Sequence, residues 1–237
     1  MCWNPIVSAS FCLLYLCFNF YYYLKKPINW KQYLIFSSFY LIMELFQTFQ
    51  WLFGQVLEKN PFYDNLYGPN FCPTVNVYYT YVAFILIWLQ PVMFAYIGKI
   101  SYENSFFDKY YYICWAVFGY GMINLFLGSI MDIKQAYMIQ NSIYGLSTCT
   151  TKGGHGHLGW RFRPIMIDYD TNHFVYLLLC IISFVFYKKD LRILGYGWGI
   201  ALLITYIIFM PTNIEIASSW CLLSIIANFV IVAKIKK

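Results

Sequence analysis

Glu44 is the residue of clearest chemical interest, because its carboxyl group occurs near the middle of a long apolar segment, residues 33–57. A charged side chain at the centre of a bilayer costs on the order of 2.5–3.5 kcal/mol on insertion scales, so we expect Glu44 to face other helices and to have a partner. A carboxyl group surrounded by neutral donors can hold a proton, pass it on, or bind a cation. Helical spacing puts four further side chains on the same face: Gln47, Thr48, Trp51 and Gln55.

Two polar residues in other apolar segments are candidate members of the same site. Gln90 precedes Pro91, which removes a backbone hydrogen bond; Gln90 either satisfies the freed carbonyl or faces a polar cavity opened by a kink. Asn124 lies in the next apolar segment. The polar residues are open to three interpretations: hydrogen bonding that joins helices, a path for protons or ions, or a ligand-binding site.

A glycine-rich loop carries a second kind of chemistry. His155 and His157 lie in the segment 152–157, where three of the other four residues are glycine. Alternate residues of an extended strand point to opposite faces, so the pair chelates one metal ion only if the backbone bends. Two imidazoles make half of a zinc site, and a third ligand would have to be Asp168, Asp170 or His173. Asp170 more readily caps the helix that follows.

Trp160 follows this loop and is accompanied by Arg161 and Arg163. Indole and guanidinium groups are frequent where a protein meets lipid headgroups. We therefore expect these three residues to anchor the loop at a membrane surface.

The elements that position these residues are predicted to be membrane-spanning helices. The chain has 237 residues, of which 61% are hydrophobic and 11% charged, whereas a soluble domain has about 25% charged residues. The apolar residues occur in blocks of about twenty, the length that a helix needs to cross about 30 Å of hydrocarbon. This pattern indicates an all-α polytopic membrane protein and disfavours a disordered chain, a coiled coil or a soluble enzyme.

Seven spans are predicted within a single domain, residues 1–237. Of the 16 Lys and Arg residues, eleven lie on the side of the membrane that carries the C-terminus and five on the other side. The positive-inside rule therefore predicts an exoplasmic N-terminus and a cytoplasmic C-terminus. A long exoplasmic loop is expected at 131–172. The approximate limits of the spans are 5–24, 33–57, 75–98, 110–130, 173–187, 191–211 and 213–233.

Three of the eight cysteines lie on the predicted exoplasmic side, where oxidation is permitted: Cys2, Cys72 and Cys149. The other five fall within spans, where a cysteine is most often a small buried hydrophobe. A bridge between Cys72 and Cys149 would hold the long loop over the mouth of the bundle, with Cys2 as the alternative partner.

Four short segments occur in a distinctive order: Met-Cys-Trp-Asn at 1–4, Met-Glu-Leu-Phe-Gln at 43–47, Gln-Pro at 90–91 and Gly-His-Leu-Gly-Trp at 156–160. In these segments the chain resembles a family of uncharacterised seven-helix membrane proteins from bacteria and large DNA viruses, over most of residues 1–165. The resemblance implies a shared fold, a loop motif containing His157 and Trp160, and a cysteine pair that matches Cys72 and Cys149. We therefore predict a disulfide between these two. The resemblance implies no activity.

Several activities are disfavoured by what the sequence lacks. It has no glycine-rich phosphate loop, G-x-S-x-G elbow or H-E-x-x-H motif. A retinal cofactor needs a lysine inside the last helix, and the seventh span has none before Lys234. No cofactor is predicted, and an enzyme that uses His157 ranks last among the hypotheses. Membrane lipids are expected partners, nucleic acid is not, and a homo-oligomer is compatible with the sequence.

The leading hypothesis is an integral membrane protein, in a host or viral membrane, that moves ions or protons through a polar site around Glu44. One alternative is a receptor-like bundle that binds a lipid or a small hydrophobic ligand. Another is a structural membrane component of a large DNA virus.

Overall fold

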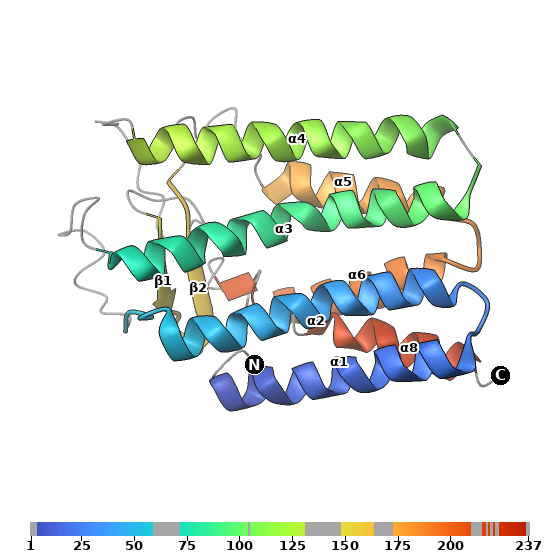
Figure 1. Ribbon diagram of the computed structural model, residues 1–237, viewed down its shortest axis with the longest axis horizontal. Coiled ribbons are helices and arrows are strands. Elements are labelled where there is room, and N and C mark those ends of the chain that lie inside the picture. Colours follow the sequence, from blue (N-terminus) through green and yellow to red (C-terminus); the bar gives the residue numbers. More distant parts are fainter. Residues whose placement is uncertain are drawn as a thin grey trace.

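The computed structural model describes residues 4–58, 72–103, 105–130, 148–163, 173–209, 215–216, 218, 220 and 223–235; the side chains of 173, 208 and 209 are not described. These residues form seven helices and two strands (Figure 1). The helices are α1 (Pro5–Lys25), α2 (Trp30–Phe53), α3 (Thr74–Ser101), α4 (Ser105–Ile130), α5 (His173–Phe186), α6 (Arg192–Phe209) and α8 (Ile225–Ile235). The strands are β1 (Cys149–Lys152) and β2 (Leu158–Arg161).

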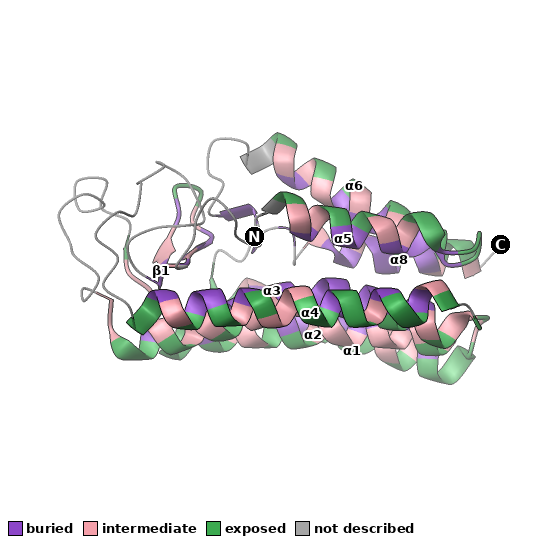
Figure 2. Ribbon diagram, turned by 90° about the horizontal axis from the view of Figure 1, so that it is seen from above, coloured by how far each residue is buried: buried purple, intermediate pink, exposed green. Residues whose placement is uncertain are grey.

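The helices run along a common axis in two layers. One layer holds α1, α2, α3 and α4 side by side in chain order, and the other holds α5, α6 and α8 (Figures 1 and 2). The layers meet where α3 packs on α5 and where α1 and α2 pack on α8. α1 begins at the end of the bundle that carries the strands, and α8 ends at the opposite end (Figure 1).

The outer surface of the bundle is apolar, and its mainly apolar interior also contains buried polar side chains. Large hydrophobic side chains such as Phe20 on α1, Phe126 on α4 and Leu203 on α6 are more than 60% exposed. Three helices, α1, α3 and α4, are long and apolar enough to cross a membrane. α2 has the length, but its polar residues lower its mean hydropathy. α5, α6 and α8 are apolar, and their described parts are shorter.

Each of the seven predicted segments contains one observed helix, although several limits differ. α4 begins at Ser105 rather than at 110, and two other differences bear on the site. α2 ends at Phe53 rather than at 57, because Gly54 and Gln55 leave the helix and Gln55 takes a φ of 48°. In the last segment, α8 itself begins at Ile225. The described residues at 215–216, 218, 220 and 223 are also helical, and a turn at Ser224 separates them from α8.

The all-α prediction is correct for the bundle but omits a β-hairpin. β1 and β2 pair antiparallel, with Cys149 opposite Arg161 and Lys152 opposite Leu158. The turn between them contains Gly156 at a φ of 82°, a backbone conformation that glycine adopts without strain. Leu57, just beyond α2, forms a parallel bridge to Thr151 and so attaches the hairpin to the bundle.

Candidate functional site

The interior site is centred on Glu44, which α2 holds fully buried. Neither carboxyl oxygen has a hydrogen-bond partner among the described residues. Gln47 lies one turn further along α2, is also fully buried, and has no partner for either amide atom in the same part of the chain. The expected partner of Glu44 is therefore not found among the side chains that the structure describes.

The packing of α1 against α2 brings a third polar side chain to this place. The two helices form an antiparallel pair in which Tyr15 stacks on Tyr40 with ring centroids 6.3 Å apart. This register places Ser8 beside the Glu44 carboxyl, although its buried hydroxyl forms no well-directed hydrogen bond with any described residue. Ser8, Glu44 and Gln47 thus form a cluster of buried polar groups from two helices, which we call the Glu44 cluster.

Thr48 and Gln90, two further predicted members, already have partners elsewhere. The Thr48 hydroxyl donates to the Glu44 backbone carbonyl at 2.9 Å. Gln90 Oε1 accepts hydrogen bonds from the hydroxyls of Tyr40 at 3.1 Å and Tyr176 at 2.7 Å, so it joins α2, α3 and α5. Since neither Glu44 carboxyl oxygen has a partner among the described residues, Gln90 does not bond to them.

Asn124 is buried on α4, and for the same reason it does not bond to the Glu44 carboxyl. The structure therefore keeps Glu44 and Gln47 together, adds Ser8, and does not join Gln90 or Asn124 to them by hydrogen bonds.

The prediction of a polar face on α2 is wrong at the C-terminal end of the helix, next to the hairpin. Gln55 lies beyond the helix and is exposed, and Trp51 is half-buried. In the second half of α2 the fully buried polar residues are Glu44, Gln47 and Gln50, at intervals of three residues. The early end of α2 removes Gln55 from the helical face, and Gln50 takes the position nearest the hairpin.

Gln50 connects α2 to both strands of the hairpin. Its amide nitrogen donates to Thr150 Oγ1 at 2.8 Å, and its amide oxygen accepts from Trp160 Nε1 at 3.0 Å. Trp160 is 1% exposed, so the prediction that its indole anchors the loop at a membrane surface is wrong. The indole instead packs inward because Gln50 supplies a buried acceptor for its N–H group.

The hairpin is also fastened to α3. Asn76 accepts a hydrogen bond from the Thr150 backbone N–H at 2.7 Å and donates to the Thr150 carbonyl at 2.9 Å, as a neighbouring strand would. The Thr80 and Thr150 hydroxyls lie 2.7 Å apart in a further hydrogen bond. A disulfide joins Cys72 to Cys149 with Cα atoms 5.8 Å apart, which confirms the predicted pair. Cys2 lies outside the described residues.

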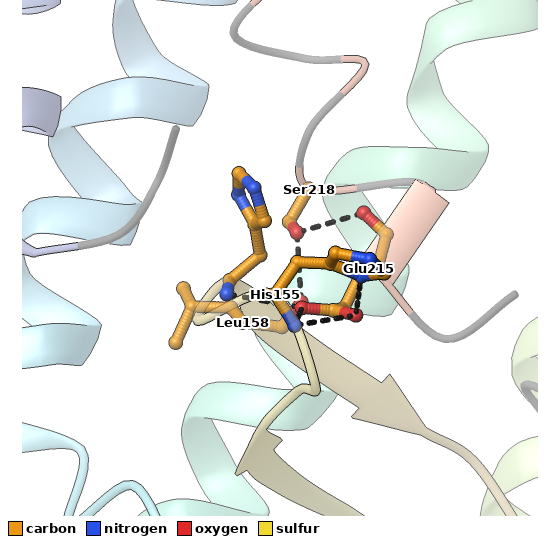
Figure 3. A network of polar contacts seen from close by, with 5 residues as sticks. His155, Leu158, Glu215 and Ser218 are labelled. Atoms are coloured by element: carbon orange, nitrogen blue, oxygen red, sulfur yellow. Dashed lines mark hydrogen bonds and ion pairs between the residues drawn. The ribbon is translucent and has the colours of Figure 1, made fainter. Parts of the chain in front are cut away.

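A buried carboxylate that the sequence analysis did not single out holds the turn of the hairpin (Figure 3). Glu215 Oε1 accepts hydrogen bonds from the backbone N–H groups of His155 and His157, both at 3.1 Å. Glu215 Oε2 lies 3.2 Å from His155 Nδ1. The nearby Ser218 hydroxyl donates to the Leu158 carbonyl at 2.7 Å. We call this set of contacts the Glu215 clasp.

The reasoning that identified Glu44 also applies to Glu215. It is a single acidic residue in the apolar segment 213–233, and such a residue needs a buried partner. The partners are mainly backbone amides of a distant loop, which a sequence pattern does not show.

The metal-site hypothesis gains no support. In the part of the chain that the structure describes, no three His, Cys, Asp or Glu side chains come together in a way that could hold a metal ion. The His155 ring pairs with Glu215. Asp168 and Asp170, including the predicted capping role of Asp170, lie outside the described residues, as does the His173 side chain.

These features define a mainly helical protein with an apolar exterior, three helices able to cross a membrane, buried polar groups and a disulfide-held hairpin at one end. The chain is similar to "Uncharacterized protein R287" of Acanthamoeba polyphaga mimivirus, with 48% identity over 239 aligned residues that cover 98% of this chain and 95% of the relative. The chain belongs to the family of this viral protein. No protein-family model and no solved structure matches it.

Proposed function

We propose that the protein is a multi-pass membrane protein that moves protons or small cations at the Glu44 cluster. The observation that carries this proposal is the burial of the Glu44 carboxyl and the Gln47 amide without partners among the described residues. Buried polar groups are normally hydrogen-bonded, and an exception calls for an explanation. Ionisable groups at bilayer depth commonly mark ion or proton pathways.

The arrangement of the helices supports seven spans with an exoplasmic N-terminus. α1 begins and α8 ends at opposite ends of the bundle (Figure 1). The disulfide lies at the hairpin end, which fits an oxidising exoplasmic compartment. At the other end, Lys26, Lys99 and Lys188 lie over aromatic rings, an arrangement suited to the headgroups of a cytoplasmic leaflet. Membrane lipids are thus the proposed surroundings of the apolar surface.

A line of polar side chains extends from the cluster in both directions along α2. Gln47 and Gln50 lead from Glu44 towards Thr150 of the hairpin. In the other direction, Tyr40 lies one turn from Glu44 and donates to Gln90, which also accepts from Tyr176. Hydroxyl and amide groups at these positions supply the hydrogen-bonding surface that a proton or a partly hydrated cation needs in order to move.

Vesicles containing the reconstituted protein test this proposal. With a membrane potential imposed, we expect a pH-sensitive dye to report proton entry, or a cation-sensitive dye to report cation entry. Glu44→Gln keeps the shape of the side chain but removes its charge, and should abolish the flux. Glu58→Gln is the matched control, since Glu58 is exposed beyond the end of α2. If Glu44→Gln retains full flux while Glu44→Leu unfolds the bundle, Glu44 only joins helices.

A second candidate function is the binding of a small apolar ligand with a hydrogen-bond acceptor. The observation that favours it is the pair Trp198 and Trp220, whose ring centroids lie 4.3 Å apart and whose buried indole N–H groups have no acceptor among the described residues. Tyr176 and Phe184 pack against the same pair. Lipids co-purified with the protein, identified by native mass spectrometry and lost in Trp220→Phe, would support this function.

A further inference from the structure

We infer that the Glu44 cluster is a binding site for one monovalent alkali cation. The inference rests on the proposed function, because it names the class of ion that this site takes. Its starting point is the kind of atom in the cluster that has no partner among the described residues. Four of them are oxygens: both carboxyl oxygens of Glu44, the amide oxygen of Gln47 and the hydroxyl oxygen of Ser8. Carboxylate, amide and hydroxyl oxygens are the ligands that hard cations prefer.

These oxygens come from two packed helices, α1 and α2. Glu44 and Gln47 are three residues apart and so lie on the same face of α2. Ser8 approaches the Glu44 carboxyl from α1. All three side chains are fully buried, so bulk water does not replace a missing partner. The Thr48 hydroxyl donates to the Glu44 carbonyl, so it is not one of the oxygens without a partner.

Among the described residues, the cluster carries one acidic group, which matches a monovalent ion. No ion pair of the described residues involves Glu44, so its charge has no Lys or Arg counterpart in that part of the chain. The other described carboxylates belong to different places: Glu58, Glu103, Asp108 and Asp190 lie in loops or at a helix start, and Glu215 forms the clasp. One carboxylate neutralises one alkali cation. A divalent ion would leave a positive charge buried and uncompensated, which is costly at low dielectric constant.

The thermal stability of the full-length protein in zwitterionic lipid nanodiscs tests the inference. Tryptophan fluorescence would report unfolding as LiCl, NaCl or KCl is added, with choline chloride keeping the ionic strength constant. A ligand that binds only the folded protein raises Tm with the logarithm of its concentration, here by about 5 °C or more at a hundredfold excess over Kd. We expect this rise with at least one of the three alkali cations and no added rise with CaCl2.

Ser8→Ala and Gln47→Leu each remove one oxygen ligand without touching the carboxylate. Both should raise the cation concentration needed for half-maximal stabilisation by about tenfold or more. Ser37→Ala is the matched control: Ser37 is also a fully buried serine whose hydroxyl has no partner among the described residues, but it lies seven residues, about 10 Å, from Glu44 along α2. It should leave the cation response unchanged. Ser8→Ala and Gln47→Leu still test the inference if Glu44→Gln does not fold.

The inference would be overturned by equal stability in choline and in all three alkali salts, or by a response to Ca²⁺ that equals the alkali response. An unchanged response in both Ser8→Ala and Gln47→Leu would also overturn it, by placing the ion elsewhere. The experiments distinguish failure of the inferred cation site from failure of the proposed transport function. Proton flux that depends on Glu44, without any alkali-specific stabilisation, would refute the cation site and leave transport standing. Alkali binding without flux would refute the transport function and leave the cation site standing.

Discussion

The Glu215 carboxyl group packs directly on the α-carbon of Gly153: a β-carbon added at Gly153 would lie 2.1 Å from Glu215 Cδ. This approach is possible only because Gly153 has no side chain. It lets the carboxylate reach the backbone N–H groups of the hairpin turn. The contact between the turn and the segment before α8 therefore depends on a glycine in the loop as much as on the carboxylate that it faces.

Gly153→Ala should displace Glu215 and weaken the clasp. Overpacking of this kind typically costs about 1–3 kcal/mol, which we expect as a lower Tm and a lower midpoint of denaturant unfolding. Gly119→Ala is the control, because a β-carbon there meets nothing within 4 Å. In the middle of α4 that change should be neutral or stabilising by up to about 1 kcal/mol. Equal effects of the two variants would contradict the close contact.

Glu215→Gln should loosen the hairpin turn while leaving the helices folded. The amide keeps one acceptor oxygen but loses the negative charge that strengthens the hydrogen bonds from His155 and His157. Hydrogen bonds to charged groups contribute about 1.5–3 kcal/mol. We expect faster hydrogen exchange in residues 153–158, measured by mass spectrometry, with exchange in α1 and α2 unchanged. Unaltered exchange in the turn would show that the clasp does not stabilise it.

Removal of the Cys72–Cys149 disulfide should lower the stability of the whole protein. The bridge closes a loop with a sequence separation of 77 residues. The chain-entropy model gives roughly 4–4.7 kcal/mol for loops of this size, and measured values are often smaller. The double variant Cys72→Ser/Cys149→Ser should therefore have a clearly lower Tm, whereas Cys17→Ser, at an exposed free cysteine, should not. Non-reducing peptide mapping of the wild-type protein should yield the linked peptide pair.

The helical bundle could be predicted from the sequence because its apolar residues occur in blocks of about twenty, the pattern expected of membrane-spanning helices. A span needs about twenty apolar residues, and the segments that met this rule each contain a helix. Glu44 and Gln47 were predictable as buried residues for the same reason, since a polar residue inside a span must face inward. The cysteine pair followed from the resemblance to a family pattern and from the side of the membrane.

The hairpin and its attachments could not be predicted because they depend on tertiary contacts. β1 and β2 have four residues each, and their burial shows no strict alternation that a pattern could reveal. Trp160 resembled an interfacial anchor, and only the fold shows that Gln50 offers its indole a buried acceptor. Gln55 was assigned to the polar face because the end of α2 at Gly54 carries no signal beyond one glycine in an apolar stretch.

The hydrogen bond between Gln50 and Trp160 should couple the hairpin to α2 energetically. Gln50→Leu alone leaves the Trp160 N–H buried without its acceptor, and Trp160→Phe alone leaves the Gln50 amide oxygen unpaired. In the double variant neither of these unpaired polar groups remains. Its loss of stability should therefore be smaller than the sum of the two single losses by about 0.5–3 kcal/mol. Denaturant unfolding of the four proteins measures this difference. Strict additivity would mean that the bond contributes nothing.

The contact between α6 and α8 can be tested with two glycines that lie two residues apart on α6. A β-carbon at Gly197 would lie 2.4 Å from the Ala227 Cα on α8, so the helices would have to separate, whereas one at Gly199 meets nothing within 4 Å. Alanine gives the same gain in helix propensity at both positions, about 1 kcal/mol, so the difference between the variants isolates the packing. Gly197→Ala should be less stable than Gly199→Ala by about 1–3 kcal/mol. Because α8 follows directly on the segment of Glu215, Gly197→Ala should also speed hydrogen exchange in the hairpin turn, and Gly199→Ala should leave it unchanged.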